Sequence, residues 1–154
     1  MDKKSRLLLV IIVAVGISYI VSRFYFQMMI IIGDSMLPTY RNHQIVLLDK
    51  HSHDYETGDV IAFRSANLDG VVVKRIVGCP GDTVKIEEGI LLVNNEPFSF
   101  YANQFFEYDG LLCNDLKLKD QQFIVIGDNI RESKDSRYDE IGIVSLHDIL
   151  GEVI

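Results

Sequence analysis

The stretch VVVKRIV, residues 71–77, places a lysine at the centre of a β-branched run. Valine and isoleucine are enriched in strands, and Gly78 follows where a strand would end. Side chains alternate between the two faces of a strand, so Lys74 shares a face with Val72 and Ile76. That face is a dry environment for an ammonium group. The stretch therefore predicts a largely apolar strand that carries one unusual charge.

Similar short runs recur before and after this strand, separated by turn residues. We expect further strands at residues 28–32, 44–48, 60–63, 83–86, 90–93, 123–126 and 141–144, and a short helical turn at 146–150. Asn94-Asn95 suits a tight hairpin turn, because asparagine tolerates positive φ. Residues 99–119 are expected to form a loop or an irregular hairpin. The predicted fold class is mostly β, with one compact, mainly antiparallel β domain.

An uncharged stretch, LLLVIIVAVGISYIV at residues 7–21, precedes the β region and follows Lys3, Lys4 and Arg6. A helix that spans a bilayer needs about 20 mostly apolar residues. Aromatic residues up to Phe26 extend the run to that length. We therefore expect a cytoplasmic N-terminus at 1–6, a transmembrane anchor at 7–26 and an extracytoplasmic β domain at 27–154.

A cleavable signal peptide has the same basic-then-apolar layout and is the main alternative. Small residues occur at Ala14, Gly16 and Ser18, but they lie inside the apolar run rather than after it. That position favours an uncleaved anchor. A buried core helix is less consistent with a segment that is apolar on all faces.

The charge of the chain excludes some partners. The net charge is −7, and the first 23 residues hold four basic side chains and one acidic one, so −7 less +3 leaves −10 for residues 24–154. Phosphate contacts supply most of the affinity for nucleic acid, so no nucleic acid partner is expected. Attachment to anionic lipid by charge is equally unfavourable, and contact with the lipid bilayer would rest on the apolar segment.

Neither a metal nor a cofactor is expected. Cys79 and Cys113 do not make a disulfide framework or a zinc motif, and whether they pair is open, with free thiols favoured. His51 and His53 alternate in a way that suits a metal, but no further ligand is near them in sequence. An exposed loop is the better interpretation of these histidines.

Ser35 lies in the run GDSMLPT, residues 33–39, which fits a turn that exposes a hydroxyl. Burial lowers the pKa of a lysine by up to about 3–5 units. A neutral Lys74 can then accept a proton from a serine, as a general base must. The ordinary alternatives are a polar turn for the serine and a sheet rim, with the amine in water, for the lysine.

Two further runs favour the catalytic interpretation. The first, GDVIAF at residues 58–63, is a turn that leads into an apolar strand. The second, GDNIRESKDSR at residues 127–137, is dense in hydrogen-bonding groups. Within it, an ion pair between Asp135 and Arg137 would brace the loop, and Ser133 would orient a lysine amine.

Taken together, these runs resemble the conserved boxes of the bacterial type I signal peptidases, membrane-bound serine/lysine endopeptidases that remove signal peptides from exported proteins. The matching positions are 35–39, 58–60, 74–82, 127–129, 133, 135–137 and 142. Their order, and their place after an apolar segment, also match. The chain lacks the large inserted domain of some relatives, so it resembles the short Gram-positive type.

The resemblance implies a β domain of the signal peptidase type, with Ser35 as nucleophile and Lys74 as general base. The N–H of Ser35 would form part of the oxyanion hole. Ser133 would position the lysine, and Asp135 with Arg137 would hold the loop. The supporting residues are thus Asp128, Ser133, Asp135 and Arg137.

Substrate contacts are expected from shallow apolar pockets beside the serine and the lysine. The residues assigned to them are Met29, Ile31, Gly33, Val72 and Val73. Such pockets accept alanine-sized side chains, which agrees with the family preference for small residues one and three positions before the cut. An extended substrate can add as a strand along exposed backbone. The partners implied are signal peptides of exported preproteins, with transient contact to the secretion machinery.

Two positions depart from the family pattern. Gly33 stands where some relatives carry a hydroxyl that completes the oxyanion hole, and Ile130 stands where the family usually has arginine, with Arg131 one position later. Because of Ile130, a non-enzymatic or impaired membrane-tethered relative is one alternative. A self-cleaving repressor-type protease is another, but the apolar segment and the acidity argue against it. The expected location is the cytoplasmic membrane, single-pass, with the N-terminus inside and the catalytic domain outside.

Overall fold

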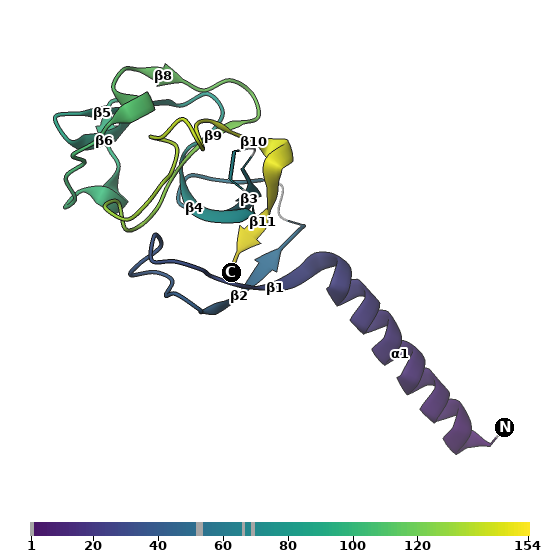
Figure 1. The fold of residues 1–154 in the computed structure, drawn as a ribbon. Helices are drawn as coiled ribbons and strands as arrows, with labels where there is room; N and C mark the ends of the chain where they lie inside the picture. Colours follow the sequence, from purple (N-terminus) through teal and green to yellow (C-terminus); the bar gives the residue numbers. More distant parts are fainter. Residues whose placement is uncertain (1, 52–53, 66, 69) are drawn as a thin grey trace.

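The computed structural model describes residues 2–51, 54–65, 67–68 and 70–154. It begins with one long helix, α1 (Lys3–Tyr25), which projects away from the β domain and meets it at β1 (Phe26–Ile30) (Figure 1). Across the described ranges, no helix combines the length and the apolar character that crossing a bilayer requires.

The larger of two sheets contains the strands that carry the site. Its order is β1-β2-β11-β3-β4-β9-β10, and every pairing is antiparallel. After β1, its strands are β2 (Ile45–Asp49), β3 (Val60–Arg64), β4 (Val71–Gly78), β9 (Gln122–Ile126), β10 (Val144–Ser145) and β11 (Ile149–Val153). The predicted mainly antiparallel β fold is confirmed.

A smaller sheet, in the order β7-β6-β5-β8, packs beside the first. Its strands are β5 (Thr83–Glu87), β6 (Ile90–Val93), β7 (Glu96–Pro97) and β8 (Leu116–Lys117). Asn94 and Asn95 have φ values of 54° and 68°, so the predicted hairpin turn is confirmed. The irregular segment 99–119 contains β8 and two single-turn helices, η1 (Ser99–Tyr101) and η2 (Gly110–Leu112).

Strand β4 is the centre of the domain. It lies between β3 and β9, with Lys74 opposite Ile61 and Ile76 opposite Val125. Its side chains enter separate apolar clusters, because Val73 packs with Val46 and Ala62 while Ile76 packs with Ile61 and Phe63. Burial on both faces explains why the sequence of this strand is almost continuously apolar.

The end of the chain differs from the prediction. The expected strand at 141–144 is wrong: residues 139–142 form a turn closed by Tyr138 O, and only Val144–Ser145 pair, as β10. The expected helical turn is shortened to η3 (Leu146–Asp148). The residues after it form β11, which lies between β2 and β3. The local sequence does not show pairing with strands as distant along the chain as β2 and β3, so this strand was not predicted.

Gly151 allows β11 to enter the sheet, which gives a first prediction. A Cβ on Gly151 would lie 2.2 Å from the backbone oxygen of Asp49. Gly151→Ala should therefore lower the free energy of unfolding by about 1–3 kcal/mol, the usual cost of overpacking. Urea unfolding measures the change. Gly16→Ala is the control, because a Cβ on Gly16 would meet no atom within 4 Å; equal stability of the two variants would contradict the packing argument.

Candidate active site

Ser35 lies on the connection between β1 and β2. Hydrogen bonds from Ile31 N to Gln44 O and from His43 N to Ile31 O extend the hairpin ladder beyond the strands. Gly33 then turns the chain with φ +96°, and its N–H donates to Asn42 Oδ1 at 3.0 Å. A side chain at this position would be strained, since that conformation favours glycine. A serine or threonine at position 33 would therefore carry backbone strain, although a Cβ there would meet no atom within 4 Å.

Lys74 and Ser35 are in direct contact. The distance from Lys74 Nζ to Ser35 Oγ is 2.7 Å, and Nζ also donates to Val73 O at 3.0 Å. The lysine is only 4% exposed. Burial lowers the pKa of Lys74 to about 8. The negative charges of Asp135 and Asp128 act in the opposite direction and raise the pKa, but by less. A buried amine with such a pKa is partly neutral near pH 8 and can accept a proton from the serine hydroxyl.

Ser133 lies next to this pair, but it does not make the expected bond. Its side chain is buried, and its hydroxyl has no hydrogen-bond partner among the described residues. A Cβ on Gly127 would meet Ser133 Oγ at 2.2 Å and Ser35 O at 2.6 Å. The missing side chain of Gly127 thus lets the Ser133 loop and the Ser35 turn approach each other. Gly127 belongs to a matching box in the sequence, but no role was predicted for it.

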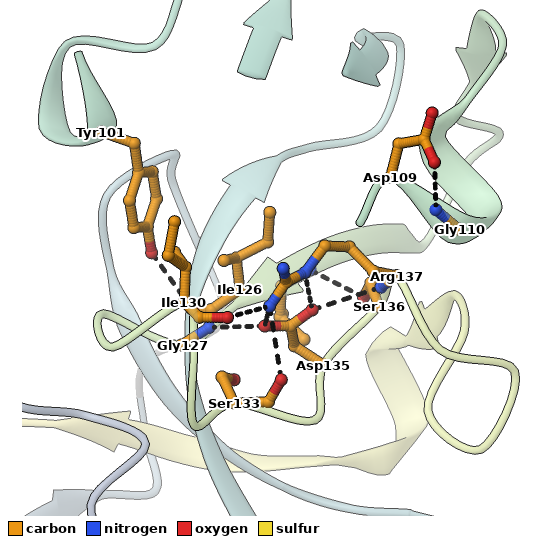
Figure 2. Close-up of polar contacts among 11 residues, drawn as sticks. Tyr101, Asp109, Gly110, Ile126, Gly127, Ile130, Ser133, Asp135, Ser136 and Arg137 are labelled. Carbon is orange, nitrogen blue, oxygen red and sulfur yellow. Dashed lines mark hydrogen bonds and ion pairs between the residues drawn. The ribbon is translucent and has the colours of Figure 1, made fainter. Parts of the chain in front are cut away.

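Asp135 and Arg137 form the predicted ion pair, and Figure 2 shows it at the centre of the loop. Arg137 Nε donates to Asp135 Oδ1 at 2.8 Å and its NH2 group donates to Oδ2 at 2.9 Å. The same NH2 group donates to Ile130 O at 2.8 Å, and Gly127 N donates to Asp135 Oδ2 at 3.2 Å. Both side chains are buried, so the pair fixes the loop from inside.

Asp128 is held by a second ion pair, buried on the Asp128 side and partly exposed at Arg75, that was not predicted from the sequence. Arg75 Nε and NH2 donate to its two carboxylate oxygens at 2.8 and 2.6 Å. Arg75 NH1 also donates to Gly58 O at 2.6 Å, and the hydroxyl of Thr39 donates to Asp128. The network joins one residue from each of the runs 35–39, 58–60, 74–82 and 127–129. Arg75 and Thr39 were not assigned a role from the sequence, although membership of those runs could have singled them out.

Asn129 fastens the same loop to the serine turn. Its backbone N–H donates to Ser35 O at 3.0 Å, and its side-chain Nδ2 donates to Asp34 O at 3.2 Å. The loop that carries Asp128 therefore holds the carbonyl groups of both peptide bonds that flank Ser35.

A cleft of about 340 Å³ opens beside Ser35 and Lys74. It is lined by Met29, Ile30, Ile31, Ile32, Ser35, Met36, Val71, Val72, Val73 and Lys74. Four residues assigned to substrate contacts, Met29, Ile31, Val72 and Val73, therefore lie at one cleft, whereas Gly33 is not part of its lining. The alternation of side chains along a strand predicted only every second residue of this segment, so Ile30 and Ile32 were missed. The regular strand ends at Ile30, and consecutive residues line the cleft there.

The remaining candidates lie outside this centre. Cys79 is half-buried and Cys113 is exposed, and both are free thiols. His51 is exposed and its ring centroid lies 4.7 Å from that of Tyr25, while position 53 lies outside the described residues.

The fold and the site together define an antiparallel β protein with a serine and a buried lysine in contact at an apolar cleft. Residues 4–154 match the family model described as signal peptidase, peptidase S26. The chain is 31% identical over 153 residues to signal peptidase I S of Bacillus subtilis strain 168, covering 92% of this chain and 82% of the relative. It is 32% identical over 157 residues to signal peptidase I of Bacillus caldolyticus, covering 92% and 84%.

A solved structure agrees with these matches. The crystal structure of a signal peptidase I from Enterococcus faecalis V583 superposes with a TM-score of 0.55 at 26% identity, covering 66% of this chain and 97% of that one. The chain belongs to the signal peptidase family, peptidase S26, as a type I signal peptidase and therefore a serine peptidase.

The buried Asp135–Arg137 pair gives a second prediction. Asp135→Asn leaves the Arg137 guanidinium buried without its counter-charge, so the free energy of unfolding should fall by about 3–5 kcal/mol in urea titrations. The control is Lys134→Ala, which removes an exposed ion pair to Glu140 of 3.6 Å on the same loop and should cost at most about 1 kcal/mol. Similar losses of unfolding free energy in both variants would show that burial does not determine how much each ion pair stabilises the protein.

Proposed function

We propose that this protein removes signal peptides from exported preproteins, with Ser35 as the nucleophile and Lys74 as the general base. The observation that carries this assignment is the 2.7 Å contact between the serine hydroxyl and an amine that is 4% exposed. Family membership supports the reaction class, and the contact supports the division of roles between the two residues.

The chemistry follows from that contact. Neutral Lys74 accepts the hydroxyl proton as Ser35 Oγ bonds to the scissile carbonyl carbon. The Ser35 N–H stabilises the resulting oxyanion. When the C–N bond breaks, the ammonium group of Lys74 returns the proton to the leaving amine. A water molecule then attacks the acyl carbon while Lys74 takes one of its protons. As the bond between that carbon and Ser35 Oγ breaks, Lys74 returns the proton to Oγ, the carboxyl product leaves and the enzyme is restored.

The supporting groups hold the lysine in a usable orientation. The bond to Val73 O uses one amine hydrogen, and the bond to Ser35 uses another position on Nζ. We assign the buried hydroxyl of Ser133, which has no partner among the described residues, to a further amine hydrogen. Ser133 thus acts as a positioning residue, while the Asp135–Arg137 pair holds the loop on which it lies.

The cleft at Met29, Ile31, Val72 and Val73 receives the segment before the scissile bond. Eight of its ten lining residues are apolar, and its volume is about 340 Å³, which suits small side chains on an extended strand. Exposed backbone at the end of β1 offers the pairing edge.

Helix α1 attaches the enzyme to the cytoplasmic membrane. The single-pass topology expected from the sequence, with the N-terminus inside and the catalytic domain outside, requires the aromatic residues up to Phe26 to complete the span. The large apolar side chains from Leu7 to Ile20 are 50–68% exposed, so water would contact them in the isolated chain. Lipid is the environment that favours such a surface, at roughly 25 cal/mol per Å² of apolar area removed from water. The basic residues Lys3, Lys4 and Arg6 favour a cytoplasmic N-terminus. Attachment there places the cleft where exported preproteins, still engaged with the secretion machinery, present their signal peptides.

The roles of Ser35 and Lys74 give a third prediction. Ser35→Ala and Lys74→Arg should each lower kcat/KM for a preprotein by about 10²–10⁴-fold, measured by mass spectrometry of the released N-terminus. Arginine fails because its guanidinium does not deprotonate in proteins. Lys134→Ala is the matched control and should cleave normally. An active Lys74→Arg enzyme would refute the base assignment.

Membrane attachment gives a fourth prediction. The full chain, expressed in bacteria, should remain in the membrane pellet after alkaline carbonate extraction. Replacing Ile11 and Val15 by aspartate costs about 2.5–3.5 kcal/mol per residue at the centre of a bilayer, so that variant should be extracted. Replacing both by leucine keeps the surface apolar and is the control. Extraction of the unmodified chain would contradict the attachment.

A further inference from the structure

A second cleft adjoins the Ser35 turn at Leu37 and Pro38. Its volume is about 600 Å³, and it is lined by Leu37, Pro38, Asn103, Gln104, Phe105, Asp128, Asn129, Ile130 and Arg131. The described lining residues of the two clefts do not overlap. A smaller hollow of about 260 Å³ continues it, because Phe105, Ile130 and Arg131 line both.

The wall of this second cleft is fastened to the candidate nucleophile. Leu37 and Pro38 follow Ser35 directly along the turn, and Asn129 donates hydrogen bonds to Ser35 O and Asp34 O. If the segment before the scissile bond fills the first cleft, the segment after it continues beyond Ser35, where Leu37, Pro38 and Asn129 line the second cleft. The second cleft is the surface that it meets there.

Arg131 gives this cleft a charge preference. It is exposed, and no ion pair or hydrogen bond to its side chain is present among the described residues. The other two arginines near the site differ, because Arg75 pairs with Asp128 and Arg137 pairs with Asp135. The cation at position 131 is therefore available to a ligand, in a domain whose net charge from residue 24 onward is −10 (the total of −7 less the +3 of residues 1–23).

The position of Arg131 follows from its neighbour. The side chain of Ile130 is 9% exposed and packs in the core cluster that contains Ile126 and Tyr101. Its backbone oxygen accepts a hydrogen bond from Arg137 (Figure 2). Because the side chain of Ile130 packs in the core, the side chain of Arg131 lies at the surface of the cleft. Phe105, which is 65% exposed, adds an aromatic face to the same surface.

We propose that the second cleft binds the first residues after the scissile bond, and that Arg131 selects preproteins with an acidic side chain in that segment. This inference rests on the proposed function, because it requires a peptide bound across Ser35. Asn103 and Gln104 supply amide groups that can bond the peptide backbone, while Arg131 is a specificity-determining residue rather than a catalytic one.

The test uses full-length protein in detergent and peptides that share one signal segment. The peptides differ only in carrying aspartate, glutamine or lysine at each of the first positions after the cut. We expect kcat/KM to be about threefold or more higher for aspartate than for lysine at one of these positions, a size typical of exposed ion pairs. The preference should diminish at 1 M salt.

Two variants make the test specific. Arg131→Glu should invert the preference between aspartate and lysine peptides, read as the ratio of their kcat/KM values within the variant. Lys134→Glu produces the same change in net charge on the same loop, at a side chain that lines neither cleft, and should keep the original preference.

The outcomes separate the two proposals. If the unmodified enzyme cuts none of the peptides, the proposed function fails and the inference falls with it. If all peptides are cut equally and Arg131→Glu changes nothing, the inference alone is overturned. If Lys134→Glu inverts the preference as strongly as Arg131→Glu, the cause is the overall charge of the domain, and the assignment to Arg131 is overturned.

Discussion

The burial of Lys74 on β4 is the constraint on which the other features of the site rest. A strand between two neighbours, with both faces covered, gives a lysine little access to water. Removing an ammonium group from water is costly, and the cost appears as a pKa lowered to about 8. The same burial brings Nζ to 2.7 Å from Ser35 Oγ. The fold therefore sets both the position and the protonation of the candidate base.

Two largely buried ion pairs hold the surrounding loops against this strand. Arg75 follows Lys74 directly on β4 and pairs with Asp128, and Arg137 pairs with Asp135 a few residues later in the same loop. Breaking such pairs is expensive because one charge is left uncompensated in the interior. They restrict the Ser35 turn, the strand and the Gly127–Arg137 loop to one arrangement. Within this arrangement Ser133 Oγ is buried and has no hydrogen-bond partner among the described residues.

The parts of the site that were predictable have local signals. The apolar strand around Lys74 and the turn at Ser35 are evident from composition alone, and the order of the boxes identified the family. The partnership of Arg75 with Asp128 spans 53 positions and has no periodic signature. Gly33 was assigned to the cleft by strand alternation, which fails where β1 ends. Strand β11 was missed because its neighbours, β2 and β3, precede it by most of the domain.

The protonation of Lys74 can be followed directly by an NMR titration of its side chain in the full-length enzyme, recorded alongside the pH dependence of kcat/KM on an uncharged peptide. Below its pKa, the lysine is protonated and does not accept the serine proton, so the rate should rise with pH and level off above the midpoint. Both curves should have midpoints near pH 8. A lysine that titrates near its ordinary pKa of about 10.4, with activity unchanged between pH 7 and pH 9, would contradict its role as the base.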